Sequence, residues 1–141
     1  MTEDELEAIR EKKREKFAGS ETADESETAP NEAKTAPGEP VHVGSVEEFS
    51  TLTTEYDVVL VDFYADWCGP CTMLEPTIAA IAEKTDAAVV KVDIDEHQGL
   101  AAQYGVRGVP TLLLFADGEQ VEQVVGVQDE AKLTSLVERH A

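Results

Sequence analysis

The sequence has very few cysteines, few basic residues and no long apolar run. Of its 141 residues two are cysteine and one is tryptophan, and 11 are lysine or arginine against 30 aspartate or glutamate. A formal net charge of −19 argues against binding nucleic acid or anionic membranes through phosphate neutralisation. No apolar run approaches the ~18 residues that a membrane span needs. The length and a hydrophobic content of 42% are enough for about one domain with one core.

The negative charge is spread along the whole chain. Residues 1–40 contain 12 acidic and 6 basic side chains, whereas residues 41–141 contain 18 acidic and 5 basic. The folded part is therefore acidic as well as the N-terminal part. One hypothesis is a halophilic protein, kept in solution at high ionic strength where salt screens the self-repulsion. The alternative is an acidic interaction surface.

The N-terminal sequence has no targeting signal that we recognise. The stretch MTEDELEAIREKKREKF lacks the apolar core of a secretory signal and is too acidic for an organellar transit peptide. We therefore expect a cytoplasmic protein. In that compartment stable disulfides are rare, and a paired CxxC is more often redox-active or metal-binding.

Composition divides the chain into three segments. Residues 1–17 form a charged segment of helix-forming residues with sparse apolar positions. Residues 18–40 contain no valine, isoleucine, leucine or aromatic residue, which predicts a disordered acidic linker. Residues 41–141 have the pattern of a folded domain. This division leaves open a second functional hypothesis. The chain would be a binding module that contacts a partner through its N-terminal segment, and the thiols would be incidental.

The apolar pattern after residue 40 predicts alternating strands and helices. Val58 to Tyr64 (VVLVDFY) indicates a central strand buried on both faces. Ser45 and Glu48 form a capping-box pattern ahead of a helix, and Pro76 should kink the helix that follows the cysteines. The other strands are expected at 41–43, 88–94, 111–115 and 120–125, and the helices at 45–54, 69–84, 98–104 and from 129 or 130 onward. This order predicts an α/β fold, a three-layer α/β/α sandwich whose mixed central sheet joins a parallel half to an antiparallel hairpin.

Both cysteines lie in the stretch DWCGPCTMLEP, at the C-terminal end of the expected central strand. Reaction sites of open α/β sheets collect at such ends. Cys68 falls at or next to the first helical position, where free backbone N–H groups and the helix dipole favour a thiolate. Cys71 lies one turn further, close enough to attack a mixed disulfide on Cys68. Gly69 adds no bulk beside the sulfur, and Pro70 stiffens the turn.

Other uses of this pair are weaker hypotheses. A structural disulfide would close a loop of only a few residues and constrain the unfolded chain little. A zinc site normally takes four ligands, but there is no second CxxC, and His42, His97 and His140 show no ligand spacing, so we predict no metal. A single-nucleophile hydrolase would not explain the second cysteine.

The sequence VVLVDFYADWCGPC resembles the thioredoxin family. The similarity continues through Pro76, KVDID at 91–95, YGVRGVPTLLLF at 104–115 and Gly126, and it covers residues 41–141. It implies a thiol–disulfide oxidoreductase that reduces protein disulfides, is recharged by a thioredoxin reductase and supports cytoplasmic redox homeostasis. No bound cofactor is expected, and the partners would be protein disulfides and the reductase, with the chain a monomer. An oxidant or isomerase on the same fold is the alternative.

The resemblance also implies roles for individual residues. Cys68 would be the attacking thiol and Cys71 the resolving thiol. Asp62 matches the buried acid beneath the pair, and a lone carboxyl in VVLVDFY should have a raised pKa because burial disfavours its charge. Lys91 matches a further family position and is a candidate partner for Asp62. The implied substrate-binding surface comprises Trp67, Gly69, Pro70, Val109, Pro110 and Gly126, with a cis-proline loop at Val109-Pro110.

Two positions depart from the family pattern, and the N-terminal segment has no match in it. Tyr64 stands where many relatives have a second tryptophan. Thr72 replaces a common lysine, which removes a positive charge near the thiols, and Asp66 adds a negative one. Cys68 could therefore be less acidic than is usual in the family. The N-terminal 40 residues have no counterpart in the fold that the family shares.

Overall fold

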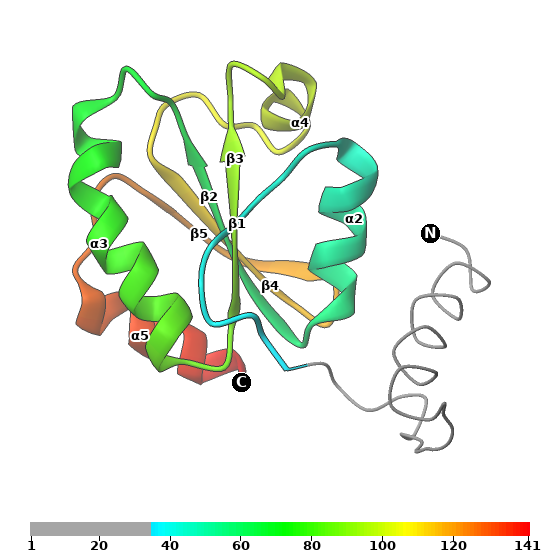
Figure 1. The fold of residues 1–141 in the computed structure, drawn as a ribbon, viewed down its shortest axis with the longest axis vertical. Coiled ribbons are helices and arrows are strands. Elements are labelled where there is room, and N and C mark those ends of the chain that lie inside the picture. The colour runs from blue at the N-terminus through cyan, green and yellow to red at the C-terminus, as the bar shows by residue number, and fades with distance from the viewer. Residues whose placement is uncertain (1–34) are drawn as a thin grey trace, which may run out of the picture. The chain divides into compact units, whose positions relative to one another are not determined.

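The computed structural model describes residues 35–141, and nine helices and strands follow in that range (Figure 1). The charged segment expected at 1–17 and most of the linker expected at 18–40 lie outside the described residues. The elements, in chain order, are β1 (Val41–His42), α2 (Val46–Glu55), β2 (Val58–Tyr64), α3 (Gly69–Lys84), β3 (Ala88–Asp93), α4 (Gln98–Gln103), β4 (Thr111–Ala116), β5 (Glu119–Val125) and α5 (Glu130–His140). Their order and approximate bounds confirm the prediction.

The five strands form one mixed sheet in the order β1-β3-β2-β4-β5. Strand β3 runs parallel to both β1 and β2, whereas β2–β4 and β4–β5 are antiparallel pairs. The parallel half is joined to the antiparallel hairpin, as predicted, and the structure places the junction between β2 and β4. In this register Asp62 of β2 lies opposite Lys91 of β3 on one side and Leu112 of β4 on the other.

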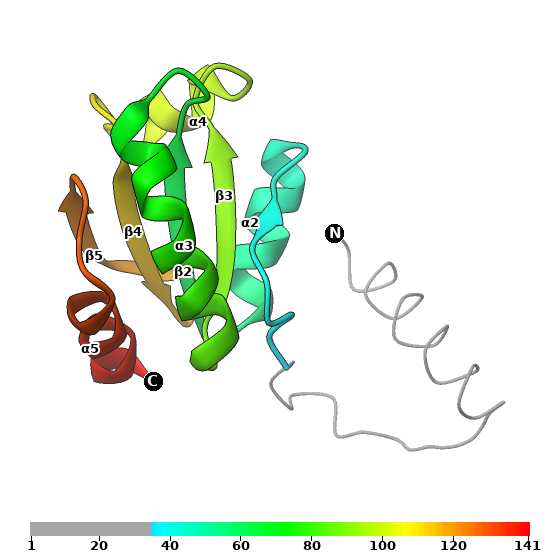
Figure 2. The same ribbon diagram turned by 60° about the vertical axis from the view of Figure 1, so that its left-hand side comes forward.

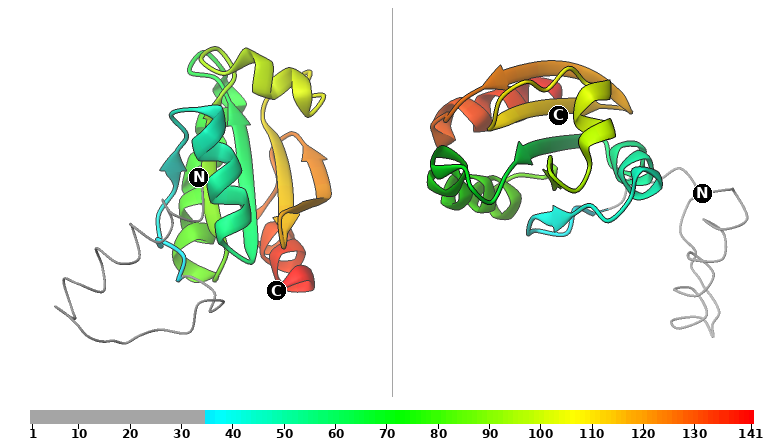
Figure 3. Two further views of the ribbon diagram at one scale, coloured as in Figure 1. Left: turned by 90° about the vertical axis from the view of Figure 1, so that its right-hand side faces the viewer. Right: turned by 90° about the horizontal axis from the view of Figure 1, so that it is seen from above.

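Helices cover both faces of the sheet, as the sandwich prediction requires (Figures 2 and 3). We call the face under α3 and α5 the α3/α5 face, and the face under α2 and α4 the α2/α4 face. On the α3/α5 face Leu60 belongs to a core with Leu74 and Leu133. On the α2/α4 face Val61 and Phe63 belong to a second core that contains the aromatic residues Phe49, Tyr104 and Phe115.

The first described helix begins with a variant of the predicted capping box. Ser45 Oγ accepts a hydrogen bond from the N–H of Glu48 at 3.0 Å. The Glu48 carboxylate reaches one residue further back than a standard box and accepts the N–H of Gly44 at 2.6 Å. Both bonds satisfy backbone donors that the helix itself leaves free.

The β4–β5 connection is the tight turn that the Asp-Gly pair predicts. Asp117 and Gly118 have φ angles of 54° and 84°, the left-handed region that this type of hairpin turn needs. None of the helices within residues 35–141 is long and apolar enough to cross a membrane. Pro76 lies inside α3, and the kink expected there stays a prediction.

Candidate redox site

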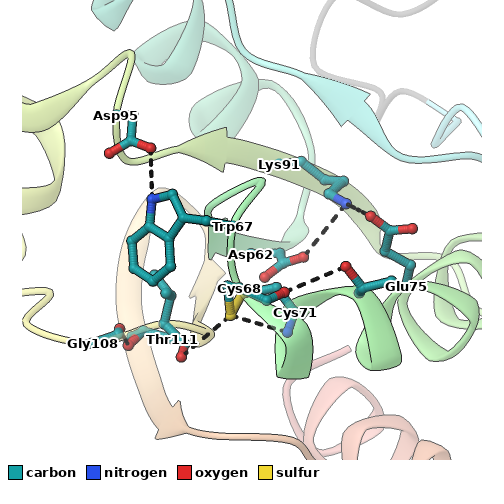
Figure 4. Close-up of a disulfide and its surroundings, with 11 residues drawn as sticks. Asp62, Trp67, Cys68, Cys71, Glu75, Lys91, Asp95, Gly108 and Thr111 are labelled. Atoms are coloured by element: carbon teal, nitrogen blue, oxygen red, sulfur yellow. Dashed lines mark hydrogen bonds and ion pairs between the residues drawn. A yellow bond between two sulfur atoms is a disulfide. The ribbon is translucent and has the colours of Figure 1, made fainter.

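The cysteine pair lies where β2 ends and α3 begins (Figure 4). Cys68 is the N-cap residue of α3 with an extended backbone, and Pro70 falls in the first helical turn. Cys68 and Cys71 form a disulfide, with their Cα atoms 5.2 Å apart. The expected placement of the pair at a helix N-terminus is thus confirmed, and the structure represents the oxidised state.

A backbone donor points at the Cys68 sulfur. The N–H of Cys71 lies 3.1 Å from Cys68 Sγ, so the sulfur takes the capping position that a serine or aspartate oxygen usually fills. In the reduced protein this donor and the helix dipole favour negative charge on Cys68. Thr72 donates its hydroxyl to the Cys68 carbonyl at 3.4 Å and so makes a local helix contact in place of the family's positive charge.

The loop before β4 faces the disulfide. The Val109 carbonyl oxygen lies 3.7 Å from Cys68 Sγ, a contact that becomes a hydrogen bond only when the sulfur carries a proton. The Val109–Pro110 peptide bond is cis, as the resemblance implies. Gly126 donates its N–H to the Pro110 carbonyl at 2.8 Å, and the Gln128 side chain donates to the carbonyls of Val125 and Gly126. These bonds bring Val109, Pro110 and Gly126 together at one edge of the site.

Trp67 is an exposed ring beside the buried cysteines. The residue is 70% exposed, whereas Cys68 and Cys71 are 4% and 3% exposed. The indole Nε1–H donates to Asp95 Oδ2 at 2.9 Å, which fixes one edge of the ring (Figure 4). Sequence reasoning missed Asp95, although a signal was present. Parallel strands β2 and β3 end at the same edge of the sheet, so residues that follow them are neighbours.

Asp62 lies buried on the α3/α5 face. Its residue is 1% exposed, and among the described residues its Oδ1 has no hydrogen-bond partner. Burial raises the pKa of Asp62 to about 6, and the attraction of Lys91 offsets only part of that effect. The expected direction of the pKa shift and its cause are confirmed. A carboxyl with such a pKa exchanges its proton near neutral pH.

Lys91 contacts three groups at once. Its Nζ lies 3.9 Å from Asp62 Oδ2, 3.8 Å from Glu75 Oε2 and 4.4 Å from the centroid of the Tyr64 ring. Sequence reasoning paired Lys91 with Asp62 but missed Glu75. No pattern in the sequence signals this contact, because it depends on how α3 crosses β3. Burial and the surrounding carboxylates raise the pKa of Tyr64 to about 12.

The three histidines make protein contacts that the sequence did not predict. His42 Nδ1 lies 3.2 Å from the Tyr64 hydroxyl, His97 Nε2 lies 3.0 Å from the Val43 carbonyl, and His140 Nε2 lies 2.9 Å from Glu122 Oε2. Across residues 35–141 the structure contains no cluster of histidine, cysteine and acidic side chains suited to a metal ion.

A mixed sheet between two helical layers, with a disulfide at the N-terminus of a helix, defines a class of proteins that exchange dithiols and disulfides. Comparison with known proteins specifies the class further. The family model described as Thioredoxin matches residues 40–139. The chain is 44% identical to the thioredoxin of Chlamydia caviae over 102 residues, which are 72% of this chain and 99% of that one.

Solved structures agree with this match. A point mutant of thioredoxin from Halobacterium salinarum NRC-1 is similar with a TM-score of 0.73 and 60% identity, covering 77% of this chain and 96% of that one. A thioredoxin of Malassezia sympodialis has a TM-score of 0.67 and 32% identity, covering 78% and 97%. The chain belongs to the thioredoxin family. It is a thiol–disulfide oxidoreductase, and the halophilic interpretation of its acidic composition fits the Halobacterium relative.

Proposed function

We propose that this chain reduces disulfides in other proteins through Cys68 and Cys71 and is recharged by a thioredoxin reductase in the cytoplasm. The observation that carries the proposal is the placement of Cys68. Its sulfur accepts the Cys71 N–H at 3.1 Å and lies 3.7 Å from the Val109 carbonyl oxygen, and the preceding residue, Trp67, is exposed. An extended substrate segment would bind over Trp67, Gly69 and Pro70.

The exchange takes two steps. The Cys68 thiolate attacks one sulfur of the substrate disulfide, so that a Cys68–substrate disulfide forms and the other substrate sulfur leaves as a thiolate, which takes up a proton. Cys71 then loses its proton, for which the buried Asp62 is the acceptor, and attacks Cys68 Sγ. The Cys68–Cys71 disulfide forms, the second substrate thiol is released, and two electrons have passed to the substrate.

The recharging step reverses this transfer. A reductase supplies two electrons to the Cys68–Cys71 disulfide and returns both cysteines to thiols. Val109, Pro110 and Gly126, which the hydrogen bond from Gly126 to Pro110 holds together, would offer backbone groups to either protein partner. Lys91 would attract the charged form of Asp62 when that carboxyl is ionised.

Trapping tests the mechanism directly. In the Cys71→Ser variant the first step proceeds but the second does not, so Cys68 should stay covalently attached to substrate proteins. Reduced full-length variant is incubated with oxidised insulin, and the adduct is measured by intact mass. Cys68→Ser is the control and should form no adduct. The absence of an adduct with Cys71→Ser would contradict the proposed attack by Cys68.

The reduction potential separates a reductase from an oxidant or isomerase. Equilibration against a reference dithiol in molar KCl should give a value near the ~−270 mV of thioredoxins as a class. A value between about −180 and −120 mV would assign the chain to the oxidants or isomerases instead.

A further inference from the structure

Glu75 approaches the proton-accepting part of the site from outside. It lies on α3, one turn after Cys71, and its side chain is 55% exposed. Its Oε2 lies 3.8 Å from Lys91 Nζ, and the same ammonium lies 3.9 Å from Asp62 Oδ2. Lys91 is 8% exposed and Asp62 is 2% exposed at the side chain, so one almost buried cation lies between a buried and an exposed carboxylate (Figure 4).

The charges of Lys91 and Glu75 adjust the protonation of Asp62, in addition to the larger effect of its burial. Both distances from Lys91 Nζ exceed the 2.7–3.2 Å of a good hydrogen bond, so neither carboxylate holds the ammonium alone. If Glu75 neutralises Lys91, an ionised Asp62 leaves one uncompensated negative charge at a buried position. A protonated Asp62 leaves the group of three neutral. Glu75 therefore weakens the support that Lys91 gives to the Asp62 charge.

We propose that Glu75 is a positioning residue of the exchange reaction: by competing with Asp62 for the Lys91 ammonium, it keeps the buried carboxyl protonated at higher pH than Lys91 alone would allow. The proposal rests on the proton-accepting role proposed for Asp62 above. It predicts that Glu75 shifts the pH range in which Cys71 resolves a mixed disulfide. The direction agrees with the electrostatics at Asp62, where Lys91 lowers the pKa and Glu75 raises it.

Other charged and titratable groups near Asp62 do not repeat this arrangement. Strand β4 presents the apolar Leu112 opposite Asp62. The charged residues Glu130, Arg139 and His140 of α5 lie near Lys84 and Glu122. The charged groups that act on Asp62 are Lys91 of β3 and Glu75 of α3. Its neighbour Tyr64 lies near His42 of β1, Asp93 of β3, and Asp66 and Glu96 in the loops. Cys71 of α3 is held in the disulfide and does not titrate in the oxidised protein. Among the described residues, Glu75 is the one carboxylate besides Asp62 with an ion pair to Lys91.

The first test is the titration of Asp62 itself in the oxidised full-length protein, followed by carbon-13 NMR of its carboxyl group. Glu75→Gln removes the negative charge and keeps the side-chain shape. The pKa of Asp62 should then fall by about 0.5 to 1 unit, because its ionised form regains the full attraction of Lys91. Glu75→Asp retains the negative charge, so the pKa of Asp62 should stay close to its value in the unmodified chain.

A matched control lies on the same helix. Glu83 is also exposed on α3, two turns further along, so Glu83→Gln changes the net charge equally without altering the surroundings of Lys91. Its Asp62 titration should match that of the unmodified chain. An unchanged Asp62 pKa in Glu75→Gln, or an equal shift in Glu83→Gln, would overturn the proposal.

The second test is the rate of mixed-disulfide resolution from pH 5 to pH 8. With Glu75→Gln the acidic limb of the profile should move to lower pH by the same amount as the Asp62 titration, which raises the rate at pH 5 about threefold for a shift of half a unit. A shifted titration with an unshifted rate profile would overturn the positioning role. Failure of the unmodified chain to reduce insulin would instead contradict the proposed function, so the two failures are distinguishable.

Discussion

The two faces of strand β2 differ in chemistry although they share one backbone. On the α2/α4 face, Val59, Val61 and Phe63 are fully buried in an apolar and aromatic core. On the α3/α5 face, Leu60 is followed by Asp62 and Tyr64 as the strand approaches the cysteines. The α2/α4 face of the strand is therefore apolar throughout, whereas the α3/α5 face combines apolar packing at Leu60 with an ionisable group near the disulfide.

This difference explains how the fold tolerates a carboxylate in its core. An ionised carboxyl without a hydrogen-bond partner for one oxygen is destabilising when buried. The apolar face fixes the position of β2, so the strand does not shift to expose Asp62 to water.

The largest effect on stability should come from the α2/α4 face. Phe63→Ala removes a fully buried ring that lies 6.4 Å from the ring of Tyr104, and should lower the free energy of unfolding by about 3 to 5 kcal/mol. Urea unfolding followed by circular dichroism in molar KCl measures this loss. Val121→Ala, at a residue that is 38% exposed on β5, is the control and should change it by less than about 1 kcal/mol. A loss below about 1 kcal/mol for Phe63→Ala would contradict the assignment of stability to this face.

The next effect is a pH dependence that originates on the α3/α5 face. Because the pKa of Asp62 is raised from 3.8 to about 6, the folded state favours the protonated form. Its stability contribution is complete below the unfolded pKa and is lost as the pH rises through the folded pKa. Between pH 4 and pH 8 the unmodified chain should therefore lose about 2 to 3 kcal/mol of unfolding free energy through Asp62. Asp62→Asn should not show this loss, so its stability should rise by that amount relative to the unmodified chain.

Urea unfolding at several pH values measures this difference between the two proteins. A constant offset, such as the cost of a poorly paired amide, does not alter the slope. Parallel stability curves would show that Asp62 ionises as easily in the folded chain as in the unfolded one.

Asp62→Asn should also resolve mixed disulfides at least tenfold more slowly at pH 7, because the proton acceptor is lost.

A smaller effect should appear at the rim of the site and affect activity alone. Trp67→Ala removes an exposed ring, so KM for insulin should rise about five- to tenfold while the unfolding free energy changes by less than about 1 kcal/mol. Steady-state insulin reduction with dithiothreitol as the electron donor measures KM. Trp67→Phe keeps a ring but loses the hydrogen bond to Asp95. Its KM should lie between those of the unmodified chain and Trp67→Ala. An unchanged KM for Trp67→Ala would place the docking surface elsewhere.

The smallest effect should come from a helix cap remote from the site. Ser45→Ala removes the acceptor for the Glu48 N–H and should cost about 1 kcal/mol of unfolding free energy without changing KM or the pH profile. Ser50→Ala, at an exposed position inside the same helix, should stay within a few tenths of a kcal/mol. A change in the pH profile with Ser45→Ala would show that the two faces are coupled.

The sequence was sufficient to predict the helices and strands and the placement of the cysteines. VVLVDFY is apolar or aromatic at every position except Asp62, as expected for a strand that is buried on both faces. Asp117-Gly118 predicts the turn because few other pairs adopt positive φ angles. These features are local, so they are visible in the order of residues. The cysteine pair is likewise placed by the strand that precedes it and the helix that follows.

The contacts that adjust the site were not predictable in the same way. Trp67 and Asp95 are 28 residues apart, and the Glu75–Lys91 approach depends on how α3 crosses the sheet. The Glu48 side chain also bonds to Gly44 and not to the residue that the capping pattern specifies. Such contacts follow from tertiary geometry at the scale of a few ångströms, which a pattern of residue types does not encode.

The position of Trp67 determines what fluorescence can report on this protein. The chain has one tryptophan, which is largely exposed and stands next to Cys68. Its emission therefore reports the surface next to the disulfide and not either hydrophobic core. Substrate docking or a change of redox state should therefore alter the spectrum more than loss of core packing does. An unfolding curve recorded by tryptophan emission would monitor the surroundings of the site, whereas the backbone signal follows the domain.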